Sequence, residues 1–242
     1  MLFYGIFFAA AIVEIVFVPW FIKVMWPARS RKSLILKMIC ATAFVVMGVA
    51  AVLISGDWSR FAVLMLCGLV MSWFGDYFLH AKNCVAFFAA GLLCFMGGHI
   101  FYICAYSSAI RKLFPGSAFF DKYELVAIAV IFSIGVAYAI IKKMTFGGVL
   151  WAAVGVYAIV LTTMLVKAWT FALRYFSASL ENAPAVLVML CLGSLLFFMS
   201  DCTLAIILFG GKRGHYPIKI FNLVTYFLGQ MFLAASMIFV AA

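Results

Sequence analysis

Residues 185–209 read AVLVMLCLGSLLFFMSDCTLAIILF, an apolar run with one charged residue, Asp201, inside it. The hydrocarbon core of a bilayer is about 30 Å thick, and a helix of about 20 apolar residues crosses it. Similar apolar runs recur along the whole chain. We expect helices at roughly residues 2–25, 34–54, 61–80, 84–106, 123–141, 147–166, 185–209 and 219–241. The sequence therefore predicts an all-α polytopic membrane protein with eight transmembrane helices.

The composition supports one membrane domain over residues 1–242. Hydrophobic residues make up 69% of the chain and charged residues 10%, and the mean hydropathy is +1.25. These values exclude a soluble globular domain, and too few residues lie outside the expected helices to form one. We expect an integral protein of a bacterial inner membrane.

The formal net charge of +10 is explained by where the basic residues lie. Of the 17 lysines and arginines, eleven fall in or beside the odd-numbered connections between expected helices and six in or beside the even-numbered ones. Basic residues are enriched in cytoplasmic loops. The distribution therefore predicts both termini outside, and it accounts for the charge without a nucleic acid partner.

Two aspartates interrupt apolar runs, where a charged side chain costs about 2.5–3.5 kcal/mol on insertion scales and is usually functional. Asp76 lies near the end of the run Phe61–Leu79, and Asp201 lies inside the run quoted above. Each follows a small residue and precedes a leucine by three positions. They are about half the chain apart, on helices expected to run in the same direction. That spacing is compatible with a parallel four-plus-four repeat.

Counting helical rise places further polar residues at a similar depth. At 1.5 Å per residue, Asp76 and Asp201 lie about 6 Å and 12 Å from the same end of the bundle. Lys37 falls in this layer from the second helix. The eighth helix adds one polar stripe with i, i+4, i+8 spacing, formed by Asn222, Tyr226 and Gln230. His99 lies deeper, near the middle of the fourth helix.

Other ionisable residues have structural interpretations. Glu14, near mid-membrane, is expected to pair with a neighbouring helix. His80 and His215 are expected at the interface. The longest connection is expected at about 167–184. Four acids in or beside loops are expected to be solvated: Asp57, Asp121, Glu124 and Glu181.

Two carboxyl groups in one low-dielectric site cannot both ionise cheaply, so one is expected to remain a neutral acid beside one carboxylate. Such a pair can protonate a substrate, stabilise the resulting cation or activate water. Hydrolysis through an oxocarbenium ion, peptide hydrolysis and proton transport all suit it. We expect no metal or cofactor, because the three histidines are scattered and form no H-x-x-x-H pair.

Four short motifs resemble those of the YhhN-like lysoplasmalogenase family, in that family's order and approximate spacing. They are Gly75-Asp76-Tyr77-Phe78-Leu79, Gly98-His99-Ile100-Phe101-Tyr102, Ser200-Asp201-Cys202-Thr203-Leu204-Ala205 and Thr225-Tyr226-Phe227-Leu228-Gly229-Gln230. Lys37 also resembles a basic position of the family. The resemblance extends over the whole chain through the eight-helix layout.

The resemblance implies hydrolysis of the vinyl ether bond of a lysoplasmalogen, a lysophospholipid, to a fatty aldehyde and a glycerophospho-ethanolamine or -choline. Asp76 and Asp201 would be the catalytic pair. Asn222, Tyr226 and Gln230 would hold water or the glycerol hydroxyl, Lys37 would meet the phosphate, and His99 would tune the pair or line the acyl channel. The alternatives are a proton-coupled transporter of a small amphiphile, an intramembrane aspartyl protease and a non-catalytic scaffold.

Overall fold

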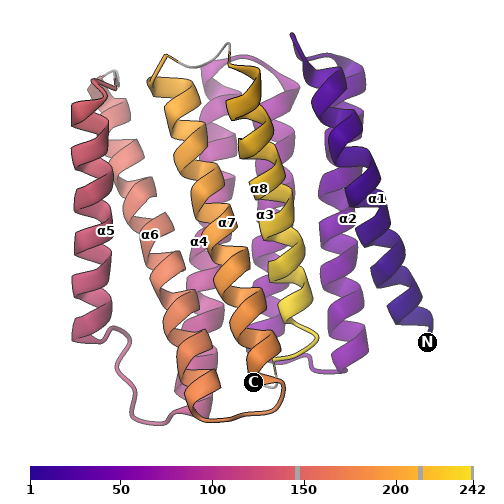
Figure 1. The fold of residues 1–242 in the computed structure, drawn as a ribbon, viewed down its shortest axis with the longest axis vertical. Coiled ribbons are helices and arrows are strands. Elements are labelled where there is room, and N and C mark those ends of the chain that lie inside the picture. Colours follow the sequence, from indigo (N-terminus) through magenta and orange to yellow (C-terminus); the bar gives the residue numbers. More distant parts are fainter. Residues whose placement is uncertain (145–147, 212–214, 241–242) are drawn as a thin grey trace.

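The computed structural model describes residues 1–144, 148–211 and 215–240, and this part of the chain forms eight helices (Figure 1). Each is long and apolar enough to cross a membrane, which confirms the predicted fold class and is typical of an integral membrane protein. The helices are α1 (Leu2–Met25), α2 (Arg31–Ser55), α3 (Arg60–Ala81), α4 (Val85–Leu113), α5 (Lys122–Ile141), α6 (Gly148–Ser177), α7 (Ala183–Phe209) and α8 (Tyr216–Ser236).

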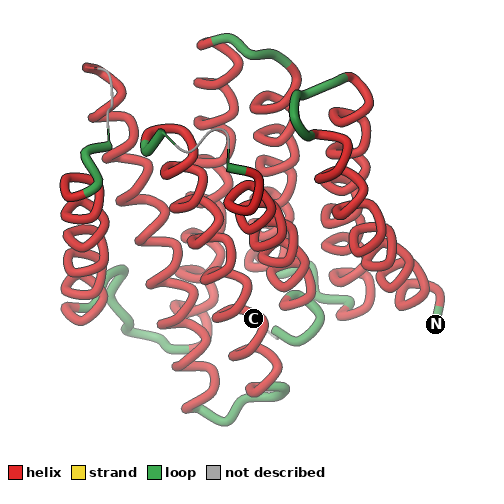
Figure 2. The backbone as a smooth tube through the Cα atoms, turned by 45° about the horizontal axis from the view of Figure 1, so that its top comes forward, coloured by secondary structure: helices red, strands yellow, loops and turns green. Residues whose placement is uncertain are grey.

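The connections lie at the two ends of the bundle (Figure 2). Both termini lie toward the same end in Figure 1, as an even number of crossings requires. The orientation in a membrane and the four-plus-four repeat stay predictions. Residue 147 of the expected sixth helix, residue 241 of the eighth, and Lys212 and Arg213 of the charge count lie outside the described residues.

The predicted connection at 167–184 is wrong over most of its length, because α6 continues to Ser177. Lys167 on α6 is only 2% exposed, and its amine donates to Glu124 Oε2 of α5 at 2.7 Å. Glu124 is also buried, so the expectation that it is solvated is wrong. Arg174 forms a second ion pair, with Asp121 just before α5. Lys167 and Arg174 can lie within a helix because Glu124 and Asp121, at the start of α5, compensate their charges.

The helices pack as antiparallel pairs with one peripheral member. Contacts join α1 to α2, α3 to α4 and α7 to α8, and α8 also packs against α1, α2 and α3. Helix α6 packs against α4 and α7. Within the described residues α5 contacts no other helix but α6, and it lies at the edge of the bundle in Figure 1. The helices that carry the predicted site residues, α2, α3, α4, α7 and α8, therefore surround the centre of the bundle.

Glycines bring the paired helices close together, as small residues do in membrane proteins. A Cβ atom on Gly229 of α8 would lie 2.9 Å from the backbone nitrogen of Phe197 and 3.0 Å from the backbone oxygen of Gly193 on α7. On α3, a Cβ atom at Gly68 would lie 2.2 Å from the ring of Tyr102 on α4. These close approaches fix the positions of Gln230, Phe197 and Tyr102 along the axis of the bundle.

Candidate active site

Asp76 lies on α3 with 1% of its surface exposed. Its Oδ1 atom is 2.8 Å from the amine of Lys37 on α2, and its Oδ2 atom accepts a hydrogen bond of 2.7 Å from the hydroxyl of Tyr226 on α8. A buried carboxylate needs an opposite charge and hydrogen-bond donors to offset desolvation. Two neighbouring helices, α2 and α8, supply both, so the carboxyl group of Asp76 is held in a fixed position.

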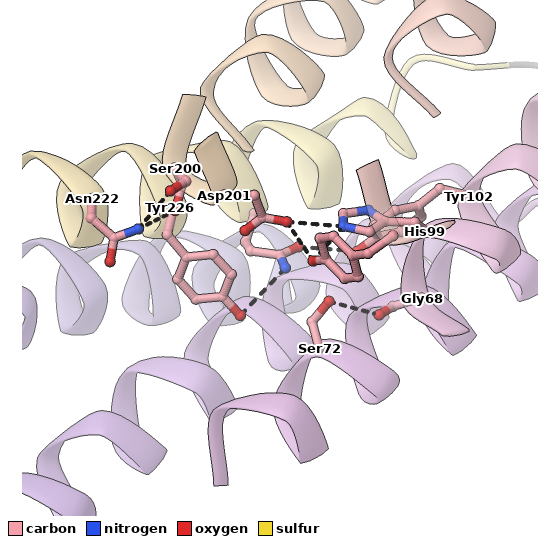
Figure 3. A network of polar contacts seen from close by, with 10 residues as sticks. Gly68, Ser72, His99, Tyr102, Ser200, Asp201, Asn222 and Tyr226 are labelled. Carbon is pink, nitrogen blue, oxygen red and sulfur yellow. Dashed lines mark hydrogen bonds and ion pairs between the residues drawn. The ribbon is translucent and has the colours of Figure 1, made fainter. Parts of the chain in front are cut away.

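Asp201 on α7 has a different set of partners, shown in Figure 3. Its Oδ2 atom accepts a hydrogen bond of 2.5 Å from the hydroxyl of Tyr157 on α6. The same oxygen lies 3.1 Å from Nε2 of His99 on α4. His99 is fully buried, and its Nδ1 atom has no hydrogen-bond partner among the described residues. Asp201 therefore shares its environment with a group that can gain or lose a proton.

His99 lies at the middle of α4, as expected from the sequence. Helix α4 has 29 residues, which corresponds to about 44 Å at 1.5 Å per residue and exceeds the thickness of a hydrocarbon core. The structure brings His99 into direct contact with Asp201.

Aromatic rings connect the two carboxyl groups. The ring of Phe197 lies between His99 and Tyr226, with centroid distances of 4.7 Å and 5.4 Å. The two aspartates are also close enough for the charge of Asp201 to act on Asp76. In the described part of the chain no hydrogen bond joins the two carboxyl groups. They occupy one buried region, but each has its own partners.

The polar stripe on α8 is tied to this region by hydrogen bonds. Asn222 Nδ2 donates to the backbone oxygen and the hydroxyl of Ser200 at 2.7 Å and 2.9 Å, next to Asp201. Gln230 Oε1 accepts from the hydroxyl of Tyr102 at 3.0 Å, and Gln230 Nε2 lies 3.5 Å from the hydroxyl of Tyr226. Asn222 and Gln230 thus hold α7, α8 and α4 in register around the carboxyl groups. Their contact with substrate stays a prediction.

Two basic residues near the site have unexpected partners. The Lys37 amine lies against Asp76 and also 3.4 Å from the Asp76 backbone oxygen, so its contact with a substrate phosphate stays a prediction. His80 is 6% exposed, and its Nε2 atom is 2.8 Å from the hydroxyl of Ser33. Its ring also packs against Phe21. His80 therefore lies buried in the last turn of α3, and its position at the membrane interface stays a prediction.

Tyr157 is the site residue that the sequence reasoning missed. Counted from the first residue of α6, it lies about 14 Å from that end of the bundle, and Asp201 lies about 12 Å from the last residue of α7 at the same end. The depth count that selected the other candidates would also have selected this hydroxyl. A single tyrosine in an apolar run resembles the aromatic residues that line many membrane helices, so it was not singled out.

The arrangement gives two carboxyl groups with different chemical properties. Asp76 is paired with a lysine amine, whereas Asp201 is bound by a tyrosine hydroxyl and an imidazole. Groups whose environments differ in this way suit separate acid and base roles. Among the described residues, His, Cys, Asp and Glu side chains form no group of three or more that could hold a metal ion.

Comparison with known proteins gives one match. The model of the YhhN family matches residues 33–237, which is most of the chain and includes both aspartates and all their hydrogen-bond partners. No curated protein and no solved structure matched the chain. Because the match covers well over half of the sequence, the chain belongs to the YhhN family.

Proposed function

We propose that this protein is a membrane hydrolase that cleaves the vinyl ether bond of a lysoplasmalogen. The observation that carries the proposal is the approach of Asp76 and Asp201 in one buried region, each with different partners. Membership of the YhhN family and the resemblance of its motifs to lysoplasmalogenases support the choice of substrate.

The chemistry needs a proton donor and a fixed negative charge. Protonation of the vinyl ether carbon that is farther from oxygen gives an oxocarbenium ion. Water adds to the positively charged carbon to form a hemiacetal, which then collapses to an aldehyde and an alcohol. Both needs resemble those of glycoside hydrolysis, where one carboxyl group donates a proton and the other opposes the developing cation.

The partners of the two aspartates suggest a different catalytic role for each carboxyl group. Asp76 is paired with Lys37, whose positive charge favours the carboxylate form, so it suits stabilisation of the oxocarbenium ion and orientation of the attacking water. Asp201, bonded to His99 and Tyr157, suits delivery of the proton, because the imidazole can resupply it from its second nitrogen. Tyr226 fixes the orientation of the Asp76 carboxylate.

The test uses purified protein in detergent and measures aldehyde release from a lysoplasmalogen. Asp76→Asn and Asp201→Asn should each lower turnover by at least about 100-fold while the protein stays monodisperse. Asp57→Asn, a loop acid outside the site, is the matched control and should leave turnover unchanged. Near-normal turnover in either site variant would reject the assignment. Movement of lysoplasmalogen into proteoliposomes without aldehyde formation would instead favour a transporter.

A further inference from the structure

A cavity of about 330 Å³ opens between the start of α3 and the end of α4. Residues from the ends of these two helices line it: Arg60, Phe61, Ser108, Ala109, Arg111 and Lys112. Phe61 and Ala109 are each 2% exposed and form a buried apolar wall, whereas the three basic residues are exposed. Within the described chain no acidic side chain lines the cavity. Its lining therefore concentrates positive charge.

The three cations of this cavity lack partners of their own. In the part of the chain that the structure describes, the ion pairs all involve other basic residues. The two cations of α6 at the same end of the bundle are paired with acids at the start of α5, but Arg60, Arg111 and Lys112 have no such compensation there. Like charges around one cavity repel each other, and an anion placed among them offsets the repulsion.

The start of α3 adds to the positive potential of the cavity. Arg60 is the first residue of α3, and the first turn of this helix holds no acidic residue. A helix N-terminus carries a partial positive charge, so it disfavours a cation and favours an anion. Arg111 and Lys112 lie in the last turn of α4, where the helix dipole accepts cations. The charge that most needs compensation is therefore on the α3 side of the cavity.

The surroundings of the cavity favour the phosphate of a membrane lipid as this anion. Trp58, two residues before Arg60, is 59% exposed, and Val63, within the first turn of α3, is 43% exposed. An exposed tryptophan at the end of a transmembrane helix is typical of the headgroup level of a bilayer. Basic pockets between transmembrane helices bind the headgroups of anionic lipids.

We propose that this cavity binds an anionic phospholipid, with the lipid phosphate among Arg60, Arg111 and Lys112. The charge of the lining selects the class of lipid. A zwitterionic headgroup carries an ammonium group that the three cations would repel, whereas a glycerol headgroup adds no positive charge. The bound phosphate would join the start of α3 to the end of α4. These helices carry Asp76 and His99, so the lipid would stabilise the framework of the candidate active site.

This lipid site is separate from the candidate active site. Arg60 and Asp76 lie on the same helix, and at 1.5 Å per residue they are about 24 Å apart along its axis. The phosphate would therefore bind toward the opposite end of α3 from the catalytic carboxyl group. The proposal does not depend on the proposed hydrolysis, and its tests measure lipid binding alone.

The first experiment is thermal unfolding of the purified protein in detergent with added lipid. Phosphatidylglycerol at about 100 times its dissociation constant should raise the melting temperature by at least about 5 °C. Phosphatidylcholine with the same acyl chains, and inorganic phosphate, should each raise it by less than about 1 °C. Equal shifts with the two lipids would overturn the proposal. A shift of the same size with inorganic phosphate would show a site for free phosphate and overturn the assignment to a lipid.

A triple variant tests whether the cavity is the binding site. Arg60→Gln/Arg111→Gln/Lys112→Gln should reduce the shift with phosphatidylglycerol to less than about 1 °C. The control removes the same amount of charge from exposed residues that do not line the cavity, and it should keep the full shift: Lys23→Gln/Arg31→Gln/Lys122→Gln. Equal loss in both triple variants would show general attraction between a cationic protein and an anionic lipid, and would overturn the site.

Native mass spectrometry gives a second measurement that does not depend on unfolding. The wild type should retain a phosphatidylglycerol molecule under conditions that remove phosphatidylcholine. The single variant Arg111→Gln should retain at least about fivefold less of it, because one charge-assisted contact is lost. This exchange of one exposed residue decides the question if the triple variant does not fold. Retention by Arg111→Gln at the wild-type level would overturn the role of the cavity.

Discussion

Replacing Lys37 with methionine tests whether the ion pair with Asp76 holds the site together. The Lys37 amine is 2.8 Å from the Asp76 carboxylate, and the two side chains are 9% and 2% exposed. Removing one partner of a buried ion pair costs about 3–5 kcal/mol, because the remaining charge loses its compensation. Tyr226 still donates to the carboxylate, so we expect a loss near the lower limit, about 3 kcal/mol. For a chain of this size that corresponds to a melting temperature roughly 10 °C lower.

The assay is thermal unfolding in detergent, followed by intrinsic tryptophan fluorescence. Lys23→Met is the matched control, because Lys23 is exposed in the last turn of α1 and should shift the melting temperature by less than about 2 °C. The double variant Lys37→Met/Asp76→Asn should regain at least half of the loss, because it removes the stranded charge. The reasoning is refuted if Lys37→Met behaves like Lys23→Met, or if the double variant melts no higher than Lys37→Met alone.

Two further predictions concern single contacts. Tyr157→Phe removes the hydrogen bond to Asp201, so turnover should fall about 10- to 100-fold with an unchanged melting temperature. Tyr138→Phe, on the exposed face of α5, is the control and should change neither turnover nor melting temperature. Gly229→Ala places a Cβ atom 2.9 Å from the backbone of α7, so the free energy of unfolding should fall by about 1–3 kcal/mol. Gly135→Ala on α5 meets no atom within 4 Å and should be neutral or stabilise by up to about 1 kcal/mol. Equal stability of the two alanine variants would show that α7 and α8 do not need this close approach.

Hydropathy predicted the membrane helices well because the apolar runs are long and uniform. Hydropathy predicted the wrong boundary where the end of a helix carries charged residues. Lys167 and Arg174 fall in the connection predicted at 167–184, yet both lie in α6, where Glu124 and Asp121 of the preceding segment compensate their charges. Whether a charge is solvated or paired depends on a residue more than 40 positions away, and no local pattern contains that information.

The depth of each polar residue along its helix predicted more of the site than hydropathy did. It grouped Asp76, Lys37 and Tyr226 correctly, because residues at equal height on neighbouring helices can meet. It could not say which residues face one another. It placed Lys37 in the same layer as Asp76 but did not predict the ion pair between them. It placed His99 correctly at the middle of its helix but did not predict the contact of this residue with Asp201.

The distribution of partners separates structural from functional polar groups. Lys37, Tyr226, Asn222 and Gln230 each contact a group on another helix, so their polarity is explained by the folded protein itself. Two polar groups near Asp76 and Asp201 are not explained in this way, Nδ1 of His99 and the carboxyl group of Glu14. The expectation that Glu14 pairs with a neighbouring helix is therefore wrong. Buried polar atoms without partners are costly and therefore rare. The position of His99 fits one need of the proposed reaction, since its contact with Asp201 is a route by which that carboxyl group can be supplied with a proton.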